Sequence, residues 1–461
     1  MTLSSLTILG GGPAGLAAAF YAHERGLPFT LFERSAHLGG LCRTFQLGAH
    51  RYDSGAHRFH DRDEDITRDV RGLLGSELVP VRAPSQILHR GRFIDFPPGP
   101  LTWLRGEGLG AAAHSAMEIL YGRLRPRPER TFEDAAINRY GRRLAQPLLI
   151  DYSEKLWGLR ARELAPEVAT SRLSGLTLKA LVVELLLPKR RSAHLDGAFL
   201  YPRSGYGAIC DALAARLPPG CVRTEHEVES LHIEDGRVDS IGFKGRPPVA
   251  VSGRVVNTLP LSGITKLLGS SLAEPAHRAA ERLSFRHTRL VFLRLNVPRC
   301  TRNASIYLPD PSLIVSRVFE PKNRSADLAP PRETSLVAEV PCSEGDPAST
   351  MDEAALVDRV VSELSGTGLL SSSMVLDHRV HLLRNAYPVY ALDSTENLRL
   401  LTTALGSFEN LDLLGRGGRF WYSHLHDQMR SAKDYVASVE KILLVAARSM
   451  PSHILRSARK L

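Results

Sequence analysis

A glycine-rich turn near the start of the chain holds residues whose types and spacing could do chemistry together. Gly10, Gly12 and Gly15 follow the pattern G-x-G-x-x-G. Gly10 allows a tight turn, Gly12 lets the backbone approach a pyrophosphate, and Gly15 lets a helix pack closely on a strand. Glu33, further along, could accept hydrogen bonds from a ribose diol. These residues predict a dinucleotide site.

The elements around this turn are those needed to hold it. Residues 6–9 and 29–32 are short apolar runs typical of buried strands, and residues 16–25 are an alanine-rich helical stretch that ends before Gly26. Strand, turn, helix and strand form a βαβ unit. The positive N-terminal end of its helix attracts a phosphate.

A second glycine pair follows the second predicted strand. Gly39 and Gly40 precede Arg43 in the pattern Gly-Gly-x-x-Arg, which would bring backbone and a cation close to a ligand. Taken alone, the pattern is a glycine turn with a surface arginine, but after a dinucleotide fingerprint it is more informative. Residues 52–60 form a strand-like stretch broken at Gly55, with His57 beside the break.

The composition is that of an ordinary globular protein with a basic surface. The chain has 461 residues, of which 43% are hydrophobic and 23% charged, and its net charge is +10. A chain of this length forms one large domain or two to three medium ones. The positive charge favours anionic partners such as phosphates, acidic substrates or an anionic membrane. Basic runs interleaved with aromatic residues are missing, so we expect no nucleic-acid binding.

The cysteines point to a reducing compartment. The five cysteines are widely spaced and contain no C-x-x-C pair, so free thiols are expected. The first strand begins too early to leave room for a signal peptide, and apolar segments of the ~18 residues needed to span a membrane are missing. We therefore expect a cytoplasmic protein.

The remaining patterns divide the chain into three parts. Residues 101–195 are mainly helical. Residues 285–390 alternate like antiparallel strands, with examples at 290–295, 313–319 and 336–340 and a hairpin pattern earlier at 87–94. From residue 397 the α/β pattern returns, with a strand at 411–414, a glycine turn at 415–418 and a last helix from near Gln428. The predicted discontinuous nucleotide-binding domain comprises 1–85, 196–284 and 391–450. Its two insertions are a helical one, 101–195, and an antiparallel-sheet substrate domain, 285–390.

One segment has two readings. Residues 176–187 are leucine-rich and are followed by the basic cluster 188–191. Such a pair could lie on an anionic membrane. A buried helix ending in a basic loop is favoured instead, because the run contains Lys179 and Glu184 and is short for an anchor.

Taken together, these motifs resemble the flavoprotein superfamily of amine oxidases, protoporphyrinogen oxidases and UDP-galactopyranose mutases, and the mutase-like branch most of all. The resemblance is carried by the Gly10 and Gly39 turns, Glu33, and segments 55–60, 154–158, 201–207, 386–390 and 415–429. It implies FAD as cofactor. It also implies an α/β fold with a Rossmann-like, glutathione-reductase-like FAD-binding domain, a helical insertion and an antiparallel-sheet substrate domain.

The resemblance also implies which residues hold FAD. In that superfamily the backbone at the position of Val228 clamps the adenine, and the final helix, near Gln428, points free amides at the pyrimidine edge of the flavin. The implied cofactor residues are Gly10, Gly12, Pro13, Ala14, Gly15, Glu33, Arg34, Gly40, Leu41, Arg43, His57, Val228, Gly415, Arg416, Asp427, Gln428 and Met429.

Four residues match catalytic positions of the mutases. Arg317, Tyr387 and Tyr422 stand where an arginine and two tyrosines hold the substrate diphosphate, and His57 stands beside the flavin ring. A guanidinium fork and phenol hydroxyls suit phosphate oxygens. Taken singly, each tyrosine would be a half-buried sheet residue and Arg317 a surface ion-pair partner.

Three functions follow from these residues. The first is a mutase-like enzyme acting through flavin N5 on a nucleotide-linked or phosphorylated sugar-like substrate, without net redox change. The second is an FAD-dependent oxidoreductase that abstracts a hydride from a small molecule, as amine oxidases and protoporphyrinogen oxidases do. The third is a binding protein that has lost the flavin, which the intact fingerprint argues against. The expected partner is a small anionic molecule, and the sequence makes no prediction of oligomeric state.

Two further groups invite other chemistry. His57, His60, His424 and His426 could suggest a metal, but carboxylate or cysteine partners at a recognisable spacing are missing, so no metal is expected. Cys42 could be a redox thiol near the cofactor, although a small packing residue is the favoured reading.

Overall fold

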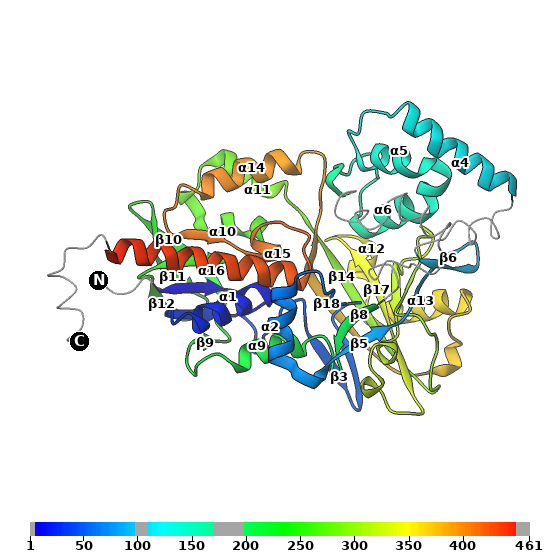
Figure 1. The fold of residues 1–461 in the computed structure, drawn as a ribbon, viewed down its shortest axis with the longest axis horizontal. Coiled ribbons are helices and arrows are strands. Elements are labelled where there is room, and N and C mark those ends of the chain that lie inside the picture. Colours follow the sequence, from blue (N-terminus) through cyan, green and yellow to red (C-terminus); the bar gives the residue numbers. More distant parts are fainter. Residues whose placement is uncertain (1–4, 97–108, 169–197, 449–461) are drawn as a thin grey trace.

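The chain folds around two sheets. The computed structural model describes residues 5–96, 109–168 and 198–448. Figure 1 shows the sheet that carries β1 covered by the helices α1 and α16, while a second sheet lies on the other side of the molecule and the helices α4, α5 and α6 form a separate layer beside it. The segment 176–191, for which the sequence left a membrane reading open, lies outside the described residues.

The first sheet is parallel and has five strands in the order β19-β13-β1-β2-β9. Its strands are β1 (Leu6–Leu9), β2 (Phe29–Phe32), β9 (Val222–Arg223), β13 (Arg254–Asn257) and β19 (Leu411–Leu413). Strand β1 is buried along its whole length, which explains its continuous apolar sequence, because both faces of a parallel sheet are covered.

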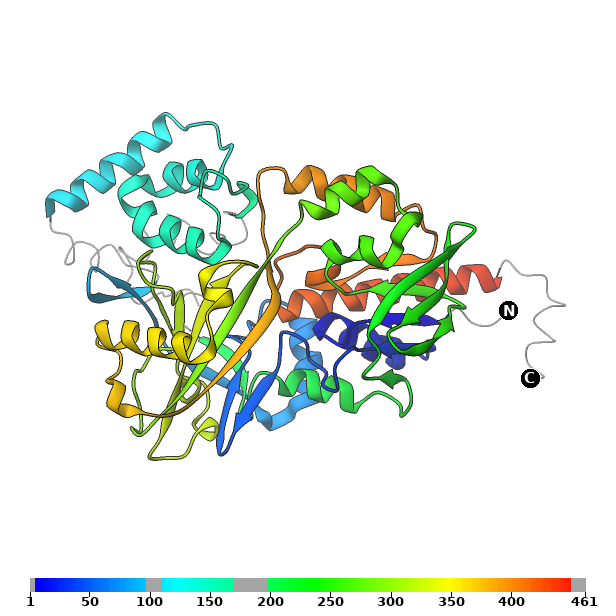
Figure 2. The ribbon, with the colours of Figure 1, turned by 180° about the vertical axis from the view of Figure 1, so that it is seen from behind.

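Each face of this sheet packs against its own layer. Leu6, Ile8 and Leu31 face the core formed with α1 (Pro13–Glu24), α9 (Ala208–Ala215) and α16 (Leu425–Arg448). Leu9 and Phe32 face the opposite core, which contains residues of the three-stranded β10-β11-β12 sheet. Successive side chains of a strand point to opposite faces, so two short strands serve both cores. Figures 1 and 2 both show α16 lying alongside α1.

The second sheet has seven strands in the order β18-β14-β17-β16-β15-β6-β7. Its strands are β6 (Ser85–His89), β7 (Arg92–Phe96), β14 (Phe285–Leu295), β15 (Ser305–Tyr307), β16 (Arg317–Phe319), β17 (Thr334–Cys342) and β18 (Val375–Pro388). All neighbours pair antiparallel except β15 and β6, which are parallel. The predicted hairpin at 87–94 is confirmed as β6 and β7. Helix α13 (Glu353–Gly366), seen in Figure 2, packs on this sheet.

The remaining strands and α-helices lie around these two sheets. The strands are β3 (Thr44–Leu47), β4 (His50–Asp53), β5 (Leu78–Arg82), β8 (Ala198–Pro202), β10 (Val228–Glu234), β11 (Arg237–Phe243) and β12 (Arg246–Ala250). The helices are α2 (Glu64–Leu74), α4 (Leu109–Leu124), α5 (Phe132–Ala145), α6 (Asp151–Trp157), α10 (Ile264–Leu268), α11 (Glu274–Glu281), α12 (Pro347–Thr350), α14 (Ser394–Leu405) and α15 (Gly415–Gly418).

The helical layer is fastened to the second sheet by two side chains of α6. Lys155 Nζ donates to the carbonyl oxygens of Leu308, at 2.6 Å, and Val315, at 3.1 Å. Trp157 is buried and its Nε1 donates to the Pro388 carbonyl oxygen at 3.1 Å. The α6 motif therefore connects the helical layer to strand ends. In the described ranges, helices long and apolar enough to cross a membrane are not found.

Three sequence predictions need correction. The strand predicted at 313–319 begins only at Arg317, because the amides of Ile314 and Val315 donate to the buried Glu363 carboxylate instead of a neighbouring strand. The glycine turn at 415–418 is the single helical turn α15. The last helix begins at Leu425, because the Asp427 carboxylate accepts the His424 amide at 2.8 Å and caps the first turn. The domain boundaries drawn from the sequence stay a prediction.

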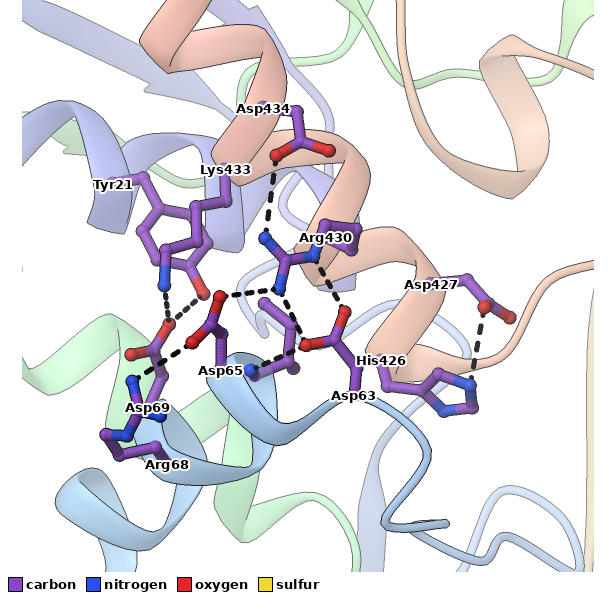
Figure 3. Close-up of polar contacts among 11 residues, drawn as sticks. Tyr21, Asp63, Asp65, Arg68, Asp69, His426, Asp427, Arg430, Lys433 and Asp434 are labelled. Carbon is purple, nitrogen blue, oxygen red and sulfur yellow. Dashed lines mark hydrogen bonds and ion pairs between the residues drawn. The ribbon is translucent and has the colours of Figure 1, made fainter.

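Ion pairs fix the start of α16 against α2, as Figure 3 shows. Arg430 donates from two nitrogens to the Asp63 carboxylate, at 2.7 and 2.6 Å. Lys433 and the Tyr21 hydroxyl both donate to Asp69, at 2.8 and 2.7 Å. A bidentate arginine–carboxylate pair sets orientation as well as distance. These contacts therefore hold the N-terminal half of α16 in place.

The Asp63–Arg430 pair predicts an acid-dependent loss of stability. The pKa of Asp63 is lowered to about 2, chiefly by its hydrogen bond to Arg430. An unfolded aspartate titrates near pH ~4, so the stabilisation is complete above that pH and is lost as the pH falls from about 4 to about 2. We expect the urea-unfolding midpoint of Asp63→Asn to decrease less between about pH 4 and about pH 2 than that of the wild type. The exposed neighbour Glu64, changed to Gln, is the control, and equal slopes in wild type and Asp63→Asn would contradict the assignment.

Candidate active site

A cavity of about 650 Å³ lies between the two sheets. We call the part lined by Gly10, Glu33 and Val228 the nucleotide end. We call the part lined by Tyr307, Arg317, Tyr387 and Tyr422 the substrate end. Residues from the beginning, middle and end of the chain meet in this cavity.

The wall of the nucleotide end is made of closely approaching backbone. Gly10 has φ +103°, which favours glycine, and a Cβ on Gly15 would overlap the Gly10 carbonyl oxygen. A Cβ on Gly40 would lie 3.0 Å from the Gly12 Cα. The two predicted glycine turns therefore lie against each other. Side chains at these positions would fill the space between the turns.

The polar groups of the nucleotide end suit a dinucleotide. The Glu33 carboxylate is held by the Gly11 amide at 2.8 Å and the Ser35 amide at 3.0 Å, and it lines the cavity. Helix α1 begins with Pro13 after Gly12 and has no side-chain cap, so its first amides are left for an anion. A fixed acid and an uncapped helix start are the groups that a ribose and a pyrophosphate require.

Most of the residues predicted to hold the cofactor line this cavity. They are Gly10, Gly12, Pro13, Ala14, Glu33, Arg34, Gly40, Leu41, His57, Val228, Arg416 and Gln428. Five others do not line it: Gly15, Arg43, Gly415, Asp427 and Met429.

The structure gives these five other contacts. Met429 is fully buried in the core beneath α16, and Asp427 caps that helix. The Arg43 guanidinium lies 5.1 Å from the centre of the Phe45 ring. A Cβ on Gly15 would meet the Gly10 carbonyl, and one on Gly415 would meet the Ala14 side chain. Gly15 and Gly415 therefore pack against residues that line the cavity.

His57 lines the cavity as a neutral imidazole. Its ring stacks on Tyr206 at 4.8 Å between centroids, and its Nε2 lies 3.3 Å from the Ser54 hydroxyl. Burial, assisted by the charges of Arg416 and Arg317, lowers the pKa of His57 to about 3. His57 is therefore uncharged near neutral pH.

Arg317 is paired inside the substrate end. Its Nε and Nη2 donate to the two oxygens of Glu339 at 2.9 and 2.8 Å, across the directly opposed positions of β16 and β17. Glu339 is 2% exposed and also accepts the Ala56 amide at 3.0 Å. Arg317 Nη2 further lies 3.4 Å from the Tyr387 hydroxyl. The guanidinium fork of Arg317 is therefore already engaged by a carboxylate.

Two tyrosines form a wall of the substrate end. The rings of Tyr387 and Tyr422 stack at 5.9 Å with an interplanar angle of 29°. The Arg416 guanidinium lies 5.9 and 5.2 Å from the centres of these two rings. Its nitrogens donate to the carbonyl oxygens of Ala386 and Ser423. The centroids of the Trp157 and Tyr422 rings lie 6.1 Å apart, so the helical layer borders this wall.

The sequence did not single out several residues that line the cavity. They include Arg58, Tyr206, Tyr307, Glu339 and Arg384. A signal existed for Glu339, a charged residue within the apolar run 336–340. Arg58 stands next to His57 in a segment that the sequence had marked. For Tyr307 and Arg384, which follow neither a motif nor a break in pattern, no such signal is present.

Two alternative chemistries find no support here. Burial raises the pKa of the Cys42 thiol to about 12, so this cavity residue is a protonated thiol of low reactivity. In the described ranges, groups of three or more histidine, cysteine or acidic residues able to hold a metal ion are not found.

Comparison with known proteins identifies the scaffold. Residues 13–412 match the protein family described as "Flavin containing amine oxidoreductase". The chain is 25% identical over 305 residues to coproporphyrinogen III oxidase of Mycobacterium tuberculosis strain H37Rv. That alignment covers 61% of this chain and 64% of the relative.

Solved structures share the fold. A reduced UDP-galactopyranose mutase superposes with a TM-score of 0.83 at 18% identity, covering 95% of this chain and 96% of that one. A putrescine oxidase with putrescine bound superposes with a TM-score of 0.67 at 15% identity, covering 95% of this chain and 99% of that one. These superpositions and the two sheets of this chain confirm the predicted fold class, an α/β cofactor domain with a sheet-based substrate domain.

The glycine contacts predict the effect of one methyl group on cofactor retention. We expect Gly15→Ala to lose most of its bound flavin, because the new Cβ would push α1 away from the Gly10 turn; such overpacking costs about 1–3 kcal/mol. The measurement is flavin absorbance per mole of purified protein. Gly72→Ala on α2, where a Cβ meets open space, is the control. Equal flavin content in both variants would contradict this role for Gly15.

Proposed function

The chain belongs to the family of flavin-containing amine oxidoreductases and is an FAD-dependent enzyme. From that premise we propose that it acts on a small anionic substrate of the nucleotide-linked or phosphorylated sugar type, in the manner of a mutase. The fold likeness to reduced UDP-galactopyranose mutase supports the choice of class. The charges of the cavity support the choice of substrate.

One observation carries the proposal: arginines outnumber carboxylates at the substrate end. Arg58, Arg317, Arg384 and Arg416 line the cavity there, against Glu339 alone among the acidic residues of its lining. The other two acidic lining residues, Glu33 and Glu227, belong to the nucleotide end. A cavity with low-dielectric walls concentrates the field of such an excess, so an anion is attracted and a cation is repelled.

The residues of the nucleotide end fit FAD. The glycine turns leave backbone rather than side chain against the cofactor, Glu33 offers oxygens to a ribose, and α1 offers its N-terminal amides to a pyrophosphate. When bound, FAD supplies a ring that exchanges electron pairs with a substrate. The rest of the chemistry depends on how the protein holds that substrate.

Tyrosine hydroxyls are the suggested donors to the substrate. Burial, with the nearby Glu339 charge, raises the pKa of Tyr387, so its hydroxyl stays protonated and can donate a hydrogen bond. Arg317 lies 3.4 Å from that hydroxyl and fixes its direction. Arg416 lies over the Tyr387 and Tyr422 rings, where its positive charge favours negative charge on a bound oxyanion. His57 presents a neutral polar edge.

A second candidate is an oxidoreductase that takes a hydride from a small anionic molecule. The sequence likeness to coproporphyrinogen III oxidase favours it, although the chain covers less than two thirds of that relative's length. The family description favours it as well. Both candidates need the same cofactor cradle and the same positive cavity.

An anaerobic titration separates the two candidates. We expect the oxidised enzyme to keep its flavin absorbance when nucleotide sugars are added, and to isomerise them only after prior reduction of the flavin, because no net redox change occurs. Absorbance at the flavin bands and product analysis provide the measurement. Bleaching of the oxidised flavin by a substrate under these conditions would support the oxidoreductase candidate instead.

The environment of His57 predicts a pH profile. Because burial lowers the pKa of His57 to about 3, the imidazole stays neutral from about pH 5 to about pH 9. We expect His57→Asn to lower kcat/KM while leaving the shape of its pH profile in that range unchanged. An ionisation present in the wild type near pH ~6 to 7 and absent in the variant would show that His57 titrates during catalysis.

A further inference from the structure

The arginines of the substrate end differ in how many of their N–H donors remain unpaired and could bind a ligand. Arg317 gives its fork to Glu339. Arg416 donates from Nε, Nη1 and Nη2 to backbone carbonyl oxygens. Arg384 lies 3.9 Å from Glu344 with a side chain 54% exposed. Arg416 and the Nε and Nη2 groups of Arg317 are therefore occupied, and Arg384 is directed largely toward solvent.

Arg58 is different. Its Nη2 donates to the Ser85 hydroxyl at 2.6 Å and lies 3.4 Å from the Ser305 hydroxyl. Its Nε and Nη1 have no protein partner, and no carboxylate pairs with it, in the described part of the chain. One face of the guanidinium is covered by the Phe199 ring at 5.1 Å, and the side chain lines the cavity. Arg58 thus presents free N–H groups to the substrate end.

A second buried arginine adds positive charge behind Arg58. Arg324 is 3% exposed, and its Nη2 lies 3.4 Å from the same Ser305 hydroxyl. Its Nη1 is buried without a hydrogen-bond partner. Two guanidinium groups that share one hydroxyl repel each other, and an anion at Arg58 relieves that repulsion. Asp53 compensates Arg324 in part, but its own oxygens accept from Tyr201, Thr44 and Tyr206.

The sheet explains why the hydroxyls meet at Arg58. Strands β6 and β15 pair in parallel with Ser85 opposite Ser305, and Tyr307 follows on the same face of β15. Tyr307 in turn lies opposite Arg317 on β16 and lines the cavity. Strand pairing therefore brings the two serine hydroxyls together, and both orient the Arg58 side chain.

We propose that Arg58, oriented by Ser85 and Ser305, is the residue that binds the oxyanion of the substrate, a phosphate or a carboxylate, in place of the paired Arg317. This inference rests on the proposed function, because it names the residue that receives the anionic substrate. The unpaired Nε and Nη1 each offer a charged N–H donor to a phosphate or carboxylate oxygen, while Nη2 stays bound to the serines. Arg317, held by Glu339, instead orients the Tyr387 hydroxyl.

The test compares anion affinity in holoenzyme variants by isothermal titration calorimetry. The probes are inorganic pyrophosphate and malonate, which separate phosphate from carboxylate recognition. The variants are Arg58→Met, Arg58→Lys and the double variant Arg317→Met/Glu339→Gln, which removes the buried pair without changing net charge. Arg51→Met, an exposed arginine of β4, is the matched control. Flavin content and Tm verify that each variant is folded and loaded with flavin. If Arg58→Met fails this check, the comparison uses Arg58→Lys.

We expect Arg58→Met to weaken binding of the preferred probe by at least about tenfold, the effect of losing a charged hydrogen bond. Arg58→Lys keeps the charge but loses the N–H donors at the Nε and Nη1 positions, so its Kd should lie between those of the wild type and Arg58→Met. The double variant should weaken binding clearly less than Arg58→Met does, and Arg51→Met should bind the probe as the wild type does.

Each contrary outcome has a separate meaning. Wild-type affinity in Arg58→Met and Arg58→Lys would overturn the inference and leave the proposed function standing. A loss in the double variant as large as that in Arg58→Met would return the oxyanion to Arg317 and also overturn the inference. A wild-type holoenzyme that binds neither probe would overturn the proposed anionic substrate itself.

Discussion

The close approach of backbone to backbone at the carboxyl edge of the parallel sheet is the constraint on which the rest of the molecule depends. The Gly10 turn lies against α1, the Gly40 turn lies against Gly12, and Gly415 lies against Ala14. These contacts join segments from both ends of the chain, and α16 then packs along α1. A cofactor cradle made of backbone is possible only where side chains are absent, so small residues at these few positions determine where the cavity opens.

Electrostatics then divides the cavity into two functional ends. At the nucleotide end, a fixed carboxylate and a helix N-terminus are groups that suit a ribose and a pyrophosphate. At the substrate end, a buried ion pair stands beside guanidinium groups that lack a carboxylate. Glu339 compensates the charge of Arg317, whereas no carboxylate of the described residues pairs with Arg58. An incoming anion therefore meets less competition at Arg58 than at Arg317.

The scaffold and the chemistry are separate properties of this chain. The fold is common to a mutase that acts on UDP-galactopyranose and to an oxidase that holds putrescine. Those ligands differ in charge, so a shared sheet and cofactor domain leave the substrate open. In this chain the excess of arginine over carboxylate at the substrate end supports the proposed anionic substrate, because buried unpaired charge is costly unless a ligand compensates it.

Local spacing in the sequence determined the elements of short range. The Gly10–Gly15 turn, the terminal acid Glu33 and the β6–β7 hairpin follow from patterns within about thirty residues, because φ/ψ preference and strand or helix period act locally. The tertiary structure alone decided which partner each charged side chain finds. Glu339 meets Arg317, and Ser85 and Ser305 meet Arg58, only after β6, β15, β16 and β17 pair in one sheet. The sequence alone offers Arg317 as a diphosphate ligand or as a surface ion-pair partner and assigns no role to Arg58, because pairing between distant strands is set by the register of the sheet and leaves no periodic trace in the chain.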